Sequence, residues 1–134
     1  MAIDSLAINL IALIPTIIFA IFVEKYYTSF WTGIWNFFAL FVTGVSMFII
    51  PIAHPPINSL WSFLPISLII LSFVMIALSI FLVRDIARIV GSSQITASLL
   101  LATYIFQYVN SSDIFIITFF SSFIAIFLIK WFLW

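Results

Sequence analysis

Few side chains in this sequence could carry out acid–base, metal or nucleophilic chemistry. The 134 residues include four acidic and four basic side chains, one histidine and no cysteine. The lack of cysteine excludes disulfides, thiolate metal sites and cysteine nucleophiles. One histidine is too few for most zinc sites, or for a haem held by two histidines of this chain. We therefore predict no catalytic residue, no metal site and no cofactor, and we do not expect an enzyme.

His54 is the most reactive single group, because an imidazole titrates near neutral pH. It lies in the sequence Ala53-His54-Pro55-Pro56, which predicts a loop. The favoured interpretation is a loop histidine with no special role. The alternative is a ligand that completes a metal or haem site on a partner subunit. Asp113 is expected on the same side of the membrane, and both residues are candidate contacts for a partner or ligand.

The most polar stretch of the chain contains Arg84, Asp85 and Arg88. Asp85 and Arg88 have the i,i+3 spacing at which opposite charges pair on a helix. We interpret the stretch as a stop-transfer and orientation signal, with contact to an anionic lipid head or a partner protein as the alternative. Glu24 is expected in an exposed pair with its neighbour at the membrane interface, and Lys130 is expected to extend its ammonium to the headgroups.

The composition indicates a membrane protein. Hydrophobic residues make up 66% of the chain and charged residues only 6%, with no net charge and a mean hydropathy of +1.42. Ordinary soluble domains are about 25% charged. Nucleic-acid binding needs clustered lysine and arginine, so no nucleic-acid partner is expected. The expected partners are the lipid bilayer and other membrane subunits, and the expected location is the cell membrane.

The gaps between charges predict an all-α integral membrane protein with one transmembrane domain over residues 1–134. A helix needs about 20 mainly apolar residues to cross roughly 30 Å of hydrocarbon. A cleaved signal peptide is the alternative for the first segment, but it would need early positive charge, and the only early charge is Asp4. The five predicted spans, in chain order, are residues 5–23, 30–52, 59–83, 94–110 and 114–134.

The fourth segment decides the topology, because it is short and rich in polar residues. An interfacial helix would need a basic polar face, and this segment has no charge. Basic residues collect in cytoplasmic loops. With five spans, an outside N-terminus and a cytoplasmic C-terminus, all four basic residues lie on the cytoplasmic side. With four spans, Lys130 would move to the outside and break this pattern.

Small and weakly polar residues mark the faces on which membrane helices pack. The chain has three glycines and no G-x-x-x-G motif, so we expect no close glycine-type crossing. We interpret the polar stripes as helix–helix seams, with a polar path through the membrane as the alternative. The stripes contain Thr43, Gly44 and Ser46; Pro65, Ser72 and Ser79; Thr96, Thr103, Gln107 and Asn110; and Thr118, Ser121 and Ser122.

These observations predict a small, non-catalytic subunit of a larger membrane complex, of a respiratory or other energy-transducing type. It would act by helix packing and by contacts with lipid, quinone or other subunits. The alternative is a small homo-oligomeric channel or carrier for an uncharged or weakly polar solute, lined by Thr103, Gln107 and Asn110. An immunity-type or viral protein that blocks another membrane protein is a third class that the composition permits. No motif set in the sequence identifies a family.

Overall fold

The computed structural model describes residues 5–26, 30–49, 64–109 and 112–134. Within these ranges the chain forms helices and contains no strand, so the predicted all-α class is confirmed. The helical segments are α1 (Ser5–Ile18), the π-helix η1 (Phe19–Val23), α2 (Phe30–Ile49), α3 (Leu64–Phe81), α4 (Arg84–Ile89), α5 (Ser92–Val109) and α6 (Ser112–Leu133).

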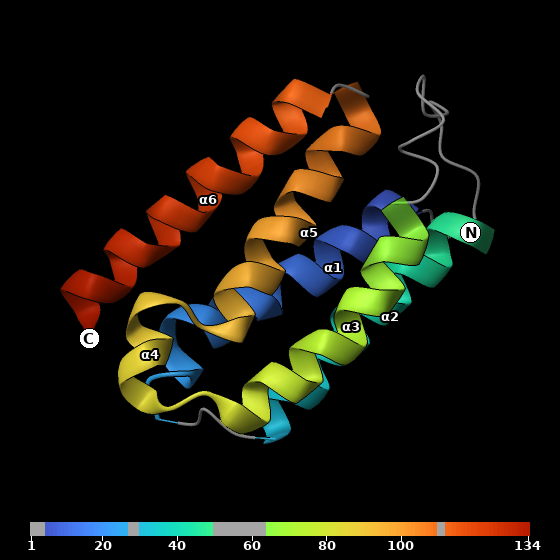
Figure 1. Ribbon diagram of the computed structural model, residues 1–134. Helices are drawn as coiled ribbons and strands as arrows, with labels where there is room; N and C mark the ends of the chain where they lie inside the picture. Colours follow the sequence, from blue (N-terminus) through green and yellow to red (C-terminus); the bar gives the residue numbers. More distant parts are fainter. Residues whose placement is uncertain (1–4, 27–29, 50–63, 110–111) are drawn as a thin grey trace.

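The long helices form two pairs that are joined by α1. Helix α3 packs along α2, α6 packs along α5, and α1 contacts both α2 and α5 (Figure 1). The short helix α4 connects α3 to α5 and packs against the end of α6. Each of the five apolar stretches expected from the sequence therefore contains a long helical segment, and α4 is an additional element. It forms over the polar stretch that contains Arg84 and Arg88.

The described interior mixes polar with apolar side chains, whereas many large apolar side chains are exposed, unlike in a soluble protein. Interior positions hold polar groups, including Asn36, Thr103 and Gln94, none of which has measurable exposure. The outer surface carries large apolar side chains such as Phe73 and Ile117. Exposed apolar surface of this extent is unfavourable in water and favourable in lipid. Among the described residues, three helical stretches are long and apolar enough to cross a membrane: Phe30–Met47, Arg84–Phe106 and Ser112–Leu133.

Helix α5 lies in the interior of the bundle. In an apolar window of 18 residues within Arg84–Phe106, 67% of the residues are buried inside the protein, against 6% in the corresponding window within Ser112–Leu133. The interfacial alternative for residues 94–110 does not fit this position, because an interfacial helix keeps one face against water or headgroups. The high polar content of α5 is explained by its burial among the other helices, where hydroxyl and amide groups find partners.

Most of the expected seams are present. Ser72 and Ser79 of α3, Thr43 and Ser46 of α2, and Thr96 and Thr103 of α5 are buried. The stripe expected on α6 is different, because Ser121 is exposed and Thr118 and Ser122 are only half-buried.

The expectation that no helices cross at a glycine is wrong. A β-carbon added at Gly33 of α2 would lie 2.9 Å from Cβ of Ser79 and 3.3 Å from Cα of Ile76, both on α3. The close approach needs only one glycine opposite one serine, so the absence of a G-x-x-x-G motif did not exclude it.

Candidate functional site

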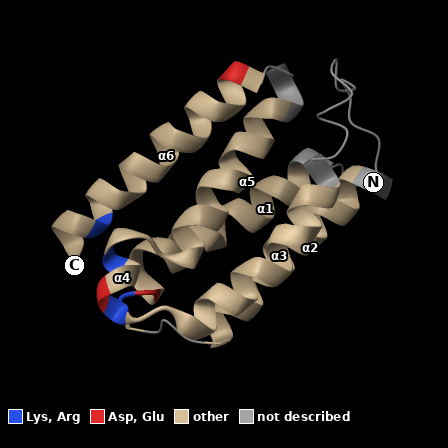
Figure 2. Cartoon of the chain, in the orientation of Figure 1, with Lys and Arg blue, Asp and Glu red and all other residues tan. Residues whose placement is uncertain are grey.

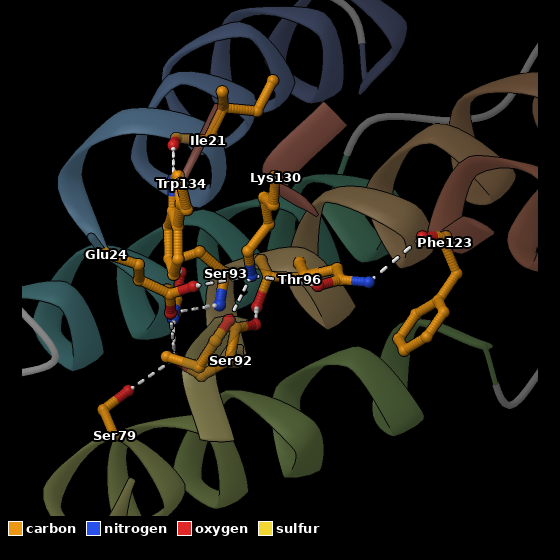
Figure 3. Close-up of polar contacts among 12 residues, drawn as sticks. Ile21, Glu24, Ser79, Ser92, Ser93, Thr96, Phe123, Lys130 and Trp134 are labelled. Atoms are coloured by element: carbon orange, nitrogen blue, oxygen red, sulfur yellow. Dashed lines mark hydrogen bonds and ion pairs between the residues drawn. The ribbon is translucent and has the colours of Figure 1, made fainter. Parts of the chain in front are cut away.

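The carboxylate of Glu24 lies against the N-terminal end of α5, far from it in the sequence. Its Oε1 accepts a hydrogen bond from the backbone N–H of Ser93 at 2.9 Å and one from the Ser92 hydroxyl at 3.0 Å. Helix N-termini attract anions, because their first N–H groups have no partner within the helix. The Glu24 carboxylate therefore caps α5 from another segment of the chain (Figure 3).

The π-helical turn η1 positions this carboxylate. The backbone N–H of Glu24 bonds to the carbonyl of Phe19, which closes the wider turn. The carbonyl of Ile21, within the same turn, accepts a hydrogen bond from the Trp134 indole at the end of the chain (Figure 3). The π-helix thus anchors the end of α6 as well as presenting Glu24 to α5.

Gly91 makes this approach sterically feasible. A β-carbon at this position would collide with the Glu24 carboxylate. Since any other residue carries that atom, the contact between Glu24 and the start of α5 requires glycine here.

Lys130 of α6 provides the opposite charge. Its Nζ lies 3.7 Å from Oε2 of Glu24, and both side chains are buried. The ammonium also donates to the Ala87 carbonyl and, at 3.0 Å, to Oε1 of Gln94. The Gln94 side-chain amide in turn donates to the Phe123 carbonyl at 3.1 Å. These two hydrogen bonds and the ion pair of Lys130 therefore tie α6 to α4, α5 and the end of η1.

Hydroxyl and amide groups extend the contacts to α2 and α3. The Asn36 side-chain amide donates to the Ser92 hydroxyl at 2.9 Å, and the Ser93 hydroxyl donates to Oδ1 of Asn36 at 3.2 Å. The hydroxyl oxygens of Ser79 and Ser92 share a hydrogen bond at 2.9 Å. We call this set the Glu24 cluster; it comprises Glu24, Asn36, Ser79, Ser92, Ser93, Gln94 and Lys130.

The Glu24 cluster connects every long helix at one end of the bundle. Its polar groups are directed mainly at one another, which fixes the relative positions of helices that elsewhere meet mainly through apolar contacts. Interhelical hydrogen bonds and ion pairs of this kind specify register in membrane bundles. Among the described residues, no group of three or more histidine, aspartate or glutamate side chains is placed to hold a metal ion.

The sequence-based placement of two charged residues is wrong. Glu24 was expected in an exposed pair, and Lys130 was expected to reach the headgroups, but their exposed fractions are 1% and 0%. Each residue lies at the end of an apolar stretch, where a side chain can turn outward or inward. The sequence did contain a signal for this cluster. Glu24 and Lys130 are opposite charges at the ends of two predicted spans, and the polar residues Ser92, Ser93 and Gln94 lie at the end of a third.

The predicted candidates of the polar stretch lie on α4. Arg84 and Asp85 are exposed, and Arg88 is half-buried. The expected pair between Asp85 and Arg88 is not formed within the described part of the chain. Instead, the Arg88 guanidinium lies 4.3 Å from the centre of the Trp131 ring and its Nη2 is 3.5 Å from the Trp131 carbonyl oxygen. Arg88 contacts the Trp131 indole instead of the Asp85 carboxylate, because α6 packs beside α4.

The other candidates are not brought together. Asp113 is exposed in the first turn of α6, at the opposite end of the bundle from α4 (Figure 2). Gln107 belongs to α5, but its side chain is not among those described. His54 and Asn110 lie outside the described residues altogether. The prediction that His54 lies on the same side of the membrane as Asp113 therefore falls outside the described residues.

Fold and site together define a helical protein with membrane-compatible helices and an internal polar cluster at one end. Comparisons with models of protein families, with curated proteins and with solved structures found no match to this chain.

Proposed function

We propose that this chain is a small, non-catalytic subunit of a larger complex in the cell membrane and that it acts by helix packing. The observation that carries the proposal is the exposed apolar face of α6, which no other described helix covers. This apolar helix packs mainly along α5, and its opposite face exposes Ile117, Phe120 and Ile124 around Ser121. A hydroxyl on an outward apolar face is a typical feature of a membrane contact surface. The energy-transducing type of complex remains a prediction from the sequence.

We also propose that five helical segments cross the bilayer with the N-terminus outside and the C-terminus in the cytoplasm. The positions of the basic residues support this arrangement. Arg84 and Arg88 of α4 lie beside Lys25 around one pocket, and Lys130 bonds to α4 from α6. All four basic residues thus gather at one end of the bundle, with Asp113 at the other (Figure 2). Such an asymmetry favours a cytoplasmic location of the basic end.

The alternative function, a solute channel or carrier, is less well supported. Of the three residues expected to line a path, Thr103 has a described side chain. It is buried, and its hydroxyl donates to the Leu99 carbonyl of its own helix at 2.8 Å. The neighbouring hydroxyls of Thr96 and Ser98 likewise donate to carbonyls one turn earlier. These groups are satisfied within helix packing and would have to rearrange to contact a solute.

A crosslinking experiment tests the subunit proposal. The tagged chain is expressed in its source cells with a photoreactive amino acid at Ile124 of α6, irradiated, extracted in digitonin and separated on a native gel. We expect adducts with other membrane proteins and migration far above the mass of a 15.3 kDa chain in detergent. The matched control carries the same amino acid at Val74 of α3, which is exposed and whose neighbours three and four residues away on the helix are all apolar.

Two results would contradict the proposal. A homogeneous homo-oligomer that transports solute in liposomes, and stops doing so in Gln107→Leu, would favour the channel or carrier. A stable monomer without adducts at Ile124 would argue against both functions.

A further inference from the structure

A second polar feature lies outside the Glu24 cluster, at the same end of the bundle. Lys25, Arg84, Asp85, Arg88 and Trp134 line a pocket of about 230 Å³. Three of these side chains are cations and one is an anion, so the lining carries an excess of positive charge. The nearby carboxylate of Glu24 is buried and already bound to Lys130 and the start of α5.

The cations of the pocket retain unused hydrogen-bonding capacity. Arg84 is exposed, and Lys25 lies 5.5 Å from the centre of the Tyr26 ring. The Nε of Arg88 is buried and donates to no group within the described residues, while the guanidinium to which it belongs lies over the Trp131 ring. An arginine held by an aromatic ring is pre-organised, and its planar guanidinium matches the geometry of phosphate oxygens.

Apolar side chains near Arg84 and Arg88 are exposed. Ile86 and Ile89 of α4 are 50% and 53% exposed, and Phe81 at the end of α3 is 79% exposed. Phe132 of α6, next in sequence to the Trp131 on which Arg88 stacks, is 83% exposed. Apolar groups beside cations are suited to the boundary between headgroups and acyl chains. An anion at this place would be joined to an apolar body, as in a phospholipid.

We propose that this pocket binds the phosphate group of an anionic phospholipid. The Arg84, Arg88 and Lys25 side chains would contact the phosphate oxygens, and the surrounding apolar side chains would contact the upper part of the acyl chains. Asp85 limits the excess positive charge, so its removal should strengthen binding. This site does not depend on the proposed subunit role, since a protein of any membrane function could carry it.

Native mass spectrometry of the protein released from nanodiscs tests the site. The nanodiscs contain phosphatidylcholine with 20% phosphatidylglycerol as the probe lipid. We expect the wild type to retain phosphatidylglycerol in preference to phosphatidylcholine. The variant Lys25→Gln/Arg84→Gln should lose this preference by about fivefold for each cation removed.

A matched pair of acidic variants separates a local effect from one of net charge. Asp85→Asn and Asp113→Asn change the net charge equally, at opposite ends of the bundle. We expect retention of phosphatidylglycerol to rise in Asp85→Asn and to stay at the wild-type value in Asp113→Asn. Equal effects of the two variants, or equal retention of the two lipids by the wild type, would overturn the proposal.

Competition with inorganic phosphate distinguishes the source of the bound group. Retention of phosphatidylglycerol in the presence of millimolar phosphate would support a lipid site. Displacement of the lipid by free phosphate would assign the same cations to a soluble phosphate compound and overturn the lipid assignment. Circular dichroism of each variant shows whether it keeps the wild-type helix content.

Discussion

The ammonium of Lys130 lies 3.7 Å from the carboxylate of Glu24, and neither side chain has more than 1% of its surface exposed. Removal of one charge from a buried ion pair leaves the other uncompensated. We expect Lys130→Met or Glu24→Leu alone to lower the free energy of unfolding by about 3 kcal/mol or more. Reversible unfolding in SDS, followed by circular dichroism, measures the loss.

The double variant Glu24→Leu/Lys130→Met provides the control for this prediction. Because it removes both charges, its loss should be clearly smaller than the sum of the two single losses. Asp113→Asn, at an exposed site, should change the stability by less than about 0.5 kcal/mol. Additive losses in the double variant would show that the two charges do not interact.

Gly91 gives a second prediction, based on steric contact. Gly91→Ala places a β-carbon against the Glu24 carboxylate, so it should force Glu24 away from the start of α5 and destabilise the protein. In a Glu24→Ala background the obstruction is absent. There the same substitution should be neutral or stabilise by about 0.4–1 kcal/mol, because alanine restricts the unfolded chain. A similar loss in both backgrounds would mean that the carboxylate is not what requires glycine.

A hydrogen bond between α2 and α1 gives a third prediction. The indole N–H of Trp35 in α2 donates to the Thr16 hydroxyl of α1 at 3.0 Å. Trp35→Phe removes the donor and should lower the unfolding free energy by about 0.6–1.5 kcal/mol. Trp31→Phe is the matched control, since Trp31 is 74% exposed and should contribute little to the bundle. Equal effects of the two substitutions would indicate loss of ring packing in general rather than loss of the hydrogen bond.

The proposed topology predicts the accessibility of engineered cysteines. The chain has no native cysteine, so single cysteines can be labelled without background. With an impermeant maleimide added outside intact cells, we expect Asp113→Cys to react. Asp85→Cys and Phe132→Cys should react only after the membrane is opened. Labelling of Asp85→Cys and Phe132→Cys from opposite sides would contradict the five-span arrangement.

The helices themselves were predictable from the sequence. Long apolar stretches must satisfy their backbone groups internally, so they form helices whether or not their neighbours are known. Charges, prolines and short polar runs interrupt these stretches, and the described ends of the helices lie near the predicted ends. The role of Ser72 and Ser79 as seam residues was also predictable, since their spacing of seven residues places them on one face.

The partners of the end residues were decided only by the tertiary structure. Glu24 and Lys130 are far apart in the chain, and a charge at the end of an apolar helix can turn either to the headgroups or to the interior. Burial of either charge is favourable only because Gly91 lets the carboxylate reach the start of α5 and because α6 brings the ammonium to the same place. Composition and periodicity determine which segments are helical, whereas the compensation of a buried charge depends on the spatial arrangement of several helices at once.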